Sequence, residues 1–196
     1  MELETNYREL GEISADELAR LQKAVSDWPD EDWDGETRQE LFRAHDYTSS
    51  IILCFGPDDD IGAARYTAIW PRWQALLDPL VQRITKAHFG GGGKIVRLMI
   101  VRLYAGAKVL PHTDDLPILH RTHRVHVPIR TSKSVIFVVG NEIVKMREGQ
   151  VVEINNQREH FVVNASKVNR VHLILDYATA DEVARSAAER NNVNSC

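Results

Sequence analysis

The residues with the clearest chemical potential are two histidines and one aspartate: His112, Asp114 and His160. Two imidazoles and one carboxylate form the ligand set that holds non-haem Fe(II) on one face and leaves further coordination positions open. On an extended strand, residues i and i+2 point the same way. His112 and Asp114 can therefore reach one ion together, while Thr113 faces away. The spacing predicts an iron site with room for a co-substrate and O₂.

A second interpretation of these residues is a surface His-x-Asp pair and an unrelated histidine. His160 follows the polar run NNQRE and opens an apolar stretch. In a roll of two sheets, such a strand can lie beside the one that carries His112, which favours the metal site. Asp115 competes as the carboxylate ligand, but its odd offset from His112 points it to the opposite face. We therefore favour Asp114.

Arg170 lies ten residues beyond His160, at the start of the apolar run VHLIL. A buried arginine needs an anionic partner, because an unpaired interior charge is very costly. Its planar guanidinium binds a carboxylate through two parallel hydrogen bonds. The functional interpretation is that Arg170 holds the far carboxylate of 2-oxoglutarate. The alternative is a structural salt bridge to an internal aspartate or glutamate.

The run HRVHVPI alternates between two kinds of side chain. Arg124 and His126 share one face, and Val125, Val127 and Ile129 share the other. Two side chains that can carry positive charge, both facing into a roll, indicate contact with an anionic co-substrate or substrate. A hydrogen-bonded core histidine and an arginine at the rim form the alternative.

The segments around these residues divide the chain into three parts. Residues 1–93 are predicted to be mainly helical, with helices over 18–28, 36–45 and 71–88 and a strand over 51–55. Ser14 and Glu17 have the spacing of a capping box for the first helix. The glycine run 90–93 ends this part.

Residues 94–178 are rich in β-branched side chains and turn residues. The predicted strands cover 94–104, 123–131, 134–139, 142–146, 150–154, 160–164 and 170–177. Short strands joined by turns favour a small barrel or a double-sheet jelly roll. We predict a single domain that is mainly β, in which residues 1–93 support the core and shape the substrate site. Residues 94–178 form the catalytic core, and 179–196 form a polar tail with the composition of a helix.

Composition excludes several classes of function. The 196 residues carry a formal net charge of −4, which gives no basic surface for nucleic acid. Two cysteines are too few for a disulfide scaffold or a thiolate cluster. The acidic N-terminus is unlike a secretory signal, and no apolar run reaches the length of a membrane span. We expect a cytoplasmic protein without nucleic-acid or membrane partners, whose oligomeric state the sequence leaves open.

These motifs together resemble the aspartyl/asparaginyl β-hydroxylase family of Fe(II)/2-oxoglutarate-dependent oxygenases. The resemblance covers roughly residues 94–178, close to half of the chain. It is carried by Gly106 and Pro111-His112-Thr113, by Arg124-Val125-His126, by Gly149-Gln150-Val151 leading through Asn155-Asn156 to Glu159-His160, and by Arg170 ahead of Ile174-Leu175-Asp176. Several separated motifs in the family's order are far more specific than any one of them.

The resemblance implies a double-stranded β-helix, a cupin-like jelly roll, packed against helices. It also implies that His112 and His160 bind Fe(II) and that Arg170 binds the distal carboxylate of 2-oxoglutarate. Arg124 and His126 would lie near the other end of this co-substrate. The best-known animal members have glycine where this chain has Asp114. The chain is in this respect similar to the related bacterial proline hydroxylases, which have the complete set of two histidines and one carboxylate.

The expected activity is hydroxylation of an unactivated C–H bond of an amino acid or an amino-acid side chain, free or peptidyl. 2-Oxoglutarate and O₂ would be consumed, with release of succinate and CO₂. The rival is a cupin-like metal-binding protein or isomerase that does not use 2-oxoglutarate. Such a site needs no arginine ten residues beyond its last ligand, so Arg170 argues against it.

Overall fold

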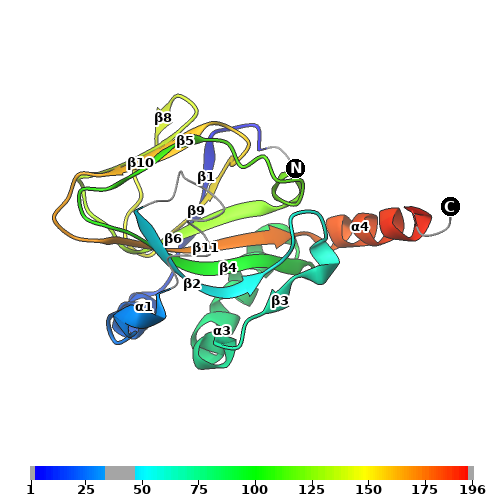
Figure 1. Ribbon diagram of the computed structural model, residues 1–196, viewed down its shortest axis with the longest axis horizontal. Helices are drawn as coiled ribbons and strands as arrows, with labels where there is room; N and C mark the ends of the chain where they lie inside the picture. The colour runs from blue at the N-terminus through cyan, green and yellow to red at the C-terminus, as the bar shows by residue number, and fades with distance from the viewer. Residues whose placement is uncertain (1–2, 34–46, 194–196) are drawn as a thin grey trace.

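The computed structural model describes residues 3–33 and 47–193, and within them two antiparallel sheets and the helices around them (Figure 1). The larger sheet has the strand order β1-β9-β6-β11-β4-β2-β3, and the smaller has the order β5-β10-β7-β8. The strands are β1 Tyr7–Glu12, β2 Thr48–Phe55, β3 Arg65–Tyr66, β4 Lys94–Leu103, β5 Lys108–His112, β6 His123–Arg130, β7 Val135–Val139, β8 Glu142–Ile143, β9 Gln150–Ile154, β10 His160–Asn164 and β11 Arg170–Ala178. The helix predicted over 36–45 lies outside the described residues.

The two sheets pack face to face. One apolar cluster joins Leu103 of β4 and Val152 of β9 to Val109 of β5, Phe137 of β7 and Val162 of β10. It therefore contains side chains of both sheets, and a double-stranded β-helix has this arrangement. The predicted fold class, a mainly β jelly roll with N-terminal helices, is confirmed.

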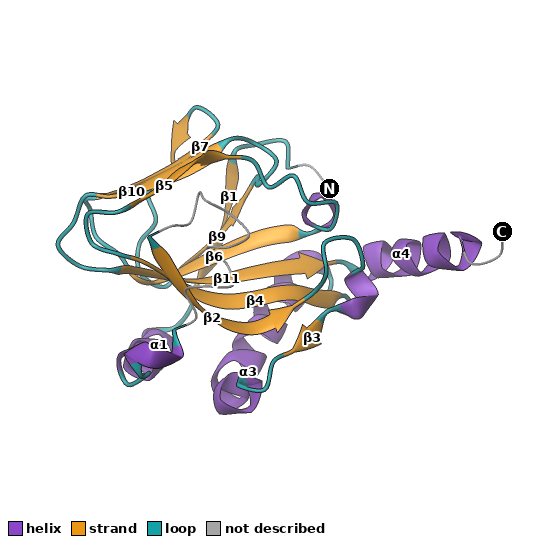
Figure 2. Cartoon of the chain, viewed as in Figure 1, coloured by secondary structure: helices purple, strands orange, loops and turns teal. Residues whose placement is uncertain are grey.

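Helices α1 (Ala15–Ser26) and α3 (Trp70–Phe89) cover the outer face of the larger sheet, where α1 packs on β6 and α3 packs on β2 (Figure 2). The predicted capping box is present. The Ser14 hydroxyl accepts the backbone N–H of Glu17, and the Glu17 carboxylate accepts the N–H of Ser14. Both orphan donors at the start of α1 are thereby satisfied.

Two positions of the run 90–93 require glycine, one for its backbone conformation and one for lack of space. Gly90 ends α3 in the left-handed region at φ 79°, where a Cβ would be strained. Gly93 lies against β11, and a Cβ there would come within 2.1 Å of the Ala178 carbonyl oxygen. The run therefore forms a tight, defined connection between helix and sheet.

The short helix α4 (Ala180–Val193) follows β11 and extends away from the two sheets (Figure 1). It covers most of the predicted polar tail, as its alanine-rich composition indicated. Among the described residues, no helix is both long enough and apolar enough to cross a membrane.

The predicted alternation of β6 is confirmed. Val125, Val127 and Ile129 belong to the core cluster beneath the helices, while Arg124 and His126 line a cavity between the sheets. The same period divides β11, whose odd positions pack toward the helices. At its even positions, Arg170, His172 and Asp176 place polar and charged groups between the sheets, next to the apolar Ile174.

Three strands lie outside the predicted ranges: the two-residue β3, β5, and β1, which is the longest of them. Residues Tyr7–Glu12 form β1, which pairs with β9 at the edge of the larger sheet. Its sequence, YRELGE, buries a single large apolar side chain, Leu10. An edge strand with one buried residue has almost no alternating pattern, so partner strand β9 decides its conformation.

Candidate active site

The structure brings His112, Asp114 and His160 together at the ends of two neighbouring strands. His112 on β5 lies directly opposite His160 on β10, and their ring centroids are 4.3 Å apart. Asp114 follows β5 in a loop that is fixed by a hydrogen bond from its N–H to the Asn156 carbonyl. One ligand atom from each of the three residues lies within 4.8 Å of the others. These donor groups fit a single metal ion.

Both imidazoles are oriented by the backbone. Nδ1 of His112 lies 2.8 Å from the Leu110 carbonyl oxygen, and Nδ1 of His160 lies 2.9 Å from that of Arg158. Because a carbonyl only accepts, each Nδ1 donates its proton to the backbone, and Nε2 is the nitrogen left to bind a metal. These Nε2 atoms lie 4.0 and 3.7 Å from the oxygens of Asp114.

The charge state of His160 also suits a metal ligand. Burial lowers the pKa of His160 to about 4, although the nearby Asp114 carboxylate opposes the shift. The ring is therefore neutral near pH 7, as metal binding requires.

Arg124 connects Asp114 to a second, fully buried carboxylate. It donates to both oxygens of Asp176, at 2.7 and 2.8 Å, and to Oδ2 of Asp114. Burial disfavours the charged guanidinium, but Asp114 and Asp176 outweigh it, so the pKa of Arg124 is raised. The pairing anchors the Asp114 carboxylate to the larger sheet.

Arg170 projects from β11 and meets two aromatic side chains. Its Nη2 donates to Nδ1 of His172 at 2.8 Å, and its guanidinium lies 5.5 Å from the ring centroid of Phe137. Burial lowers the pKa of His172 well below its ordinary value, and Arg170 and His126 act in the same direction. His172 is therefore a neutral acceptor that orients Arg170.

A cavity between the sheets gathers most of the predicted site residues. Its lining comprises Thr48, Val101, Val109, His112, Arg124, His126, Phe137, His160, Val162, Arg170 and Ile174. Four strands, β5, β6, β10 and β11, thus contribute predicted polar residues to one cavity. Apolar side chains form the rest of the wall.

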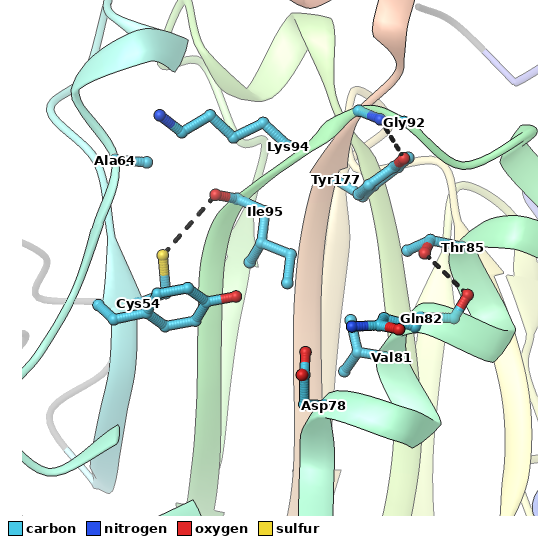
Figure 3. A pocket seen from close by; sticks show the side chains of 12 residues that line it. Cys54, Ala64, Asp78, Val81, Gln82, Thr85, Gly92, Lys94, Ile95 and Tyr177 are labelled. Atoms are coloured by element: carbon cyan, nitrogen blue, oxygen red, sulfur yellow. Dashed lines mark hydrogen bonds between the residues drawn. The ribbon is translucent and has the colours of Figure 1, made fainter. Parts of the chain in front are cut away.

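A second cavity of about 310 Å³ lies away from this site, between α3 and strands β2, β3 and β4 (Figure 3). Cys54 lines it and points its thiol toward the Ile95 carbonyl, and burial raises the pKa of Cys54 to about 11. A thiol that stays protonated near pH 7 is a poor nucleophile. Tyr177 of β11 also lines this cavity, from the face opposite Arg170.

Two buried charged residues near the metal-binding cluster were missed as site residues by sequence reasoning. Asp176 is fully buried and pairs with Arg124, and Arg97 lies beside Asp176 on the neighbouring strand β4. The available signal was the period of two, which places Asp176 on the same face of β11 as Arg170 and His172.

A family model described as Aspartyl/Asparaginyl beta-hydroxylase matches residues 65–179, more than half of the chain. The protein belongs to the aspartyl/asparaginyl β-hydroxylase family. This membership makes it an Fe(II)- and 2-oxoglutarate-dependent oxygenase, and it confirms the resemblance carried by the sequence motifs. A search of curated proteins found no match.

Solved structures share the fold of this β-hydroxylase family member. An oxidoreductase of the 2OG-Fe(II) oxygenase family from Burkholderia pseudomallei is 16% identical, with a TM-score of 0.64, over 85% of this chain and 79% of the other. A Trichoplax adhaerens prolyl hydroxylase, solved with a hypoxia inducible factor peptide fragment, is 14% identical with a TM-score of 0.62, over 93% and 88%. A Pseudomonas putida prolyl-4-hydroxylase is 15% identical with a TM-score of 0.54, over 90% and 94%.

Proposed function

We propose that this oxygenase hydroxylates an unactivated C–H bond of an amino acid or an amino-acid side chain, free or peptidyl. The observation that carries the proposal is the convergence of three metal-ligand groups within 4.8 Å, of which His112 and His160 line the same cavity as Arg170. Two of the similar structures described above are prolyl hydroxylases, one of them solved with a peptide. Their names support an amino-acid side chain as the group that reacts.

In this proposal, His112, Asp114 and His160 hold the iron. Their backbone hydrogen bonds and the pairing of Asp114 with Arg124 fix all three donors before the metal binds. Bound Fe(II) and 2-oxoglutarate supply the chemistry, in which decarboxylation to succinate and CO₂ is coupled to insertion of one oxygen atom of O₂ into the C–H bond. The protein side chains bind and orient.

Arg170 binds the distal carboxylate of 2-oxoglutarate in the same proposal. Neutral His172 and the ring of Phe137 hold its guanidinium in place. Arg124 and His126 lie near the other end of the co-substrate. The apolar walls, which include Val109 and Val162, exclude water from the reacting centre.

Anaerobic titration tests this assignment directly. Fe(II) and then 2-oxoglutarate are added to the apoprotein, and the weak visible metal-to-ligand charge-transfer band is measured. We expect a band in the wild type and, because Arg170→Ala loses a charge-assisted bidentate contact, a 2-oxoglutarate requirement roughly 10- to 100-fold higher. An unchanged requirement would refute the role of Arg170.

Two other outcomes point elsewhere. Iron binding without any band would favour a cupin-like protein that does not use 2-oxoglutarate. A protein that binds no iron would show that the cluster of His112, Asp114 and His160 is structural.

A further inference from the structure

Arg97 is a buried arginine on the metal-facing side of the larger sheet. It lies on β4 directly opposite Asp176 of β11, which lies in turn opposite Arg124 of β6. Cross-strand neighbours share a face of the sheet, and strands are about 4.8 Å apart. The backbones of Arg97 and Arg124 are therefore separated by roughly 10 Å, with Asp176 between them. Arg124 also contacts the metal ligand Asp114. A small molecule can therefore reach from the metal position to Arg97.

The hydrogen-bond donors of Arg97 are poorly satisfied for a buried charge, although its guanidinium lies over the ring of Phe55, 4.7 Å from the centroid. Arg97 is 5% exposed, and its Nε has no hydrogen-bond partner. Its Nη2 donates to Oδ1 of Asp58 at 3.3 Å, which is long for a charge-assisted bond. The Asp58 side chain is itself 61% exposed, so solvent screens this pair. Burial lowers the pKa of Arg97, against the opposing effect of Asp176.

The balance of charge in the interior points the same way. The metal-facing side holds three buried arginines, Arg97, Arg124 and Arg170, against the fully buried Asp176 and the partly buried Asp114. Fe(II) and the dianion 2-oxoglutarate add no net charge together. Arg124 is already paired with both aspartates, so the excess positive charge among these groups resides on Arg97, whose pairing with the exposed Asp58 is screened by solvent. Leaving it unbalanced is costly in a dry interior.

We infer that Arg97 binds a carboxylate of the substrate, close to the C–H bond that reacts. The inference rests on the proposed function and narrows its substrate to compounds with a free anionic carboxyl group. Free amino acids and peptides with an acidic side chain belong to this class. Neutral amides and esters do not.

Asp58 is the group that the substrate carboxylate replaces on Arg97 in this inference. The Asp58 carbonyl accepts the N–H of Ile118 at 2.9 Å, so its loop is joined to the segment that follows Asp114. In the free protein, the exposed Asp58 carboxylate occupies one donor of the guanidinium. A substrate carboxylate replaces it and also satisfies Nε, which gives the bidentate geometry that arginine prefers.

The test compares acids with their amides. The panel contains the free L-amino acids and the N-acetyl amides of aspartate and glutamate, which keep only the side-chain carboxylate. Each acid is paired with the compound in which a carboxamide replaces its carboxylate. Binding is read without turnover, from the change that each compound causes in the anaerobic charge-transfer band of the Fe(II)- and 2-oxoglutarate-loaded protein. Succinate formation in air is measured in parallel. We expect at least one acid to bind 10- to 100-fold more tightly than its amide, the range of a hydrogen bond to a charged group.

Substitutions on β4 then show which residue causes the preference for the acid over its amide. Arg97→Gln should weaken binding of that acid 10- to 100-fold and bring the acid and amide to similar affinity. Arg102→Gln is the matched control, because Arg102 lies on the opposite face of β4 and pairs with exposed Asp30. It should keep the wild-type preference. An unchanged preference in Arg97→Gln would overturn the inference.

Two results separate this inference from the function on which it rests. If the wild type forms no charge-transfer band, the proposed function fails. If the band forms but no acid in the panel changes it, the oxygenase assignment stands and the carboxylate assignment is overturned.

Asp58→Asn provides a test that does not disturb the buried cluster, because this side chain is exposed. Removal of the competing carboxylate should tighten binding of the acid, up to about fivefold, since an exposed ion pair contributes at most about 1 kcal/mol. Weaker or unchanged binding would contradict the exchange of carboxylates.

Discussion

The two faces of the larger sheet are built from the same strands but have opposite characters. On β11, Leu173 and Leu175 pack beneath the helices, while His172 and Asp176 lie between the sheets. Residues that are adjacent in sequence therefore belong to different environments, one apolar and one charged. The comparison predicts that substitutions on the helix-facing side change stability, whereas those on the metal-facing side change metal and ligand binding.

The largest effect on activity is expected for the two histidines of the smaller sheet, which lie opposite the metal-facing side of the larger sheet. His112→Ala or His160→Ala should abolish 2-oxoglutarate turnover, because either change removes an iron ligand from a set of three. Succinate formation and Fe(II) affinity are the measurements, with the thermal midpoint as a check on folding. A variant that still produces succinate at the wild-type rate would refute the ligand set.

A substitution on the helix-facing side should have the opposite result. Leu173→Ala removes a side chain that is almost fully buried and should cost about 2–5 kcal/mol of unfolding free energy. Denaturant unfolding measures this loss. The Fe(II) affinity of the folded fraction should remain that of the wild type. A large loss of affinity in a stable variant would break the division between the two faces.

The pairing of Arg124 with Asp114 allows a sharper test of the metal-facing side. If Arg124 acts by holding Asp114, Arg124→Gln should weaken Fe(II) binding roughly 10- to 100-fold, as loss of outer-shell partners does. The same substitution in an Asp114→Ala background should have little further effect on metal affinity. A double-mutant cycle on Fe(II) affinity measures this coupling.

Two results would contradict this role of Arg124. Equal losses of Fe(II) affinity in both backgrounds would show that Arg124 does not act through Asp114. A loss of 2-oxoglutarate affinity alone would assign Arg124 to the co-substrate.

The smallest expected effect is on the pH dependence of stability. Burial holds the pKa of His160 at about 4 and that of His172 well below its ordinary value, against 6.5 for the same groups in an unfolded chain. As the pH falls below 6.5, the unfolded chain takes up protons that the folded protein does not. The free energy of unfolding therefore falls as the pH is lowered from 6.5 toward the pKa values of the folded protein. Protonation of His160 in the unfolded chain should by itself lower the free energy of unfolding by roughly 1 kcal/mol between pH 7.5 and 5.5.

Urea unfolding of the metal-free protein at these two pH values measures this loss. His172→Gln should reduce the pH dependence, because it removes one of the two buried neutral rings. A variant with the full wild-type dependence would show that other groups are responsible.

Local patterns in the sequence were sufficient for several elements. The capping box at Ser14 and Glu17 located the start of α1, and alternation separated Arg124 and His126 from the apolar face of β6. Both patterns act within a few residues, so neighbouring segments do not alter them. β1 was beyond this reach, because its conformation depends on pairing with β9, some 140 residues later in the chain.

The sequence by itself determined the kinds of ligand, the alternation of the strands and the family. The tertiary structure decided which charged groups meet. The register between β5 and β10 sets His112 opposite His160, and the order β6-β11-β4 places Asp176 between Arg124 and Arg97. Strand order and register depend on the packing of the whole sheet between the helices and the second sheet. No segment carries that information alone, so the charge pairs around the site emerged only from the complete fold.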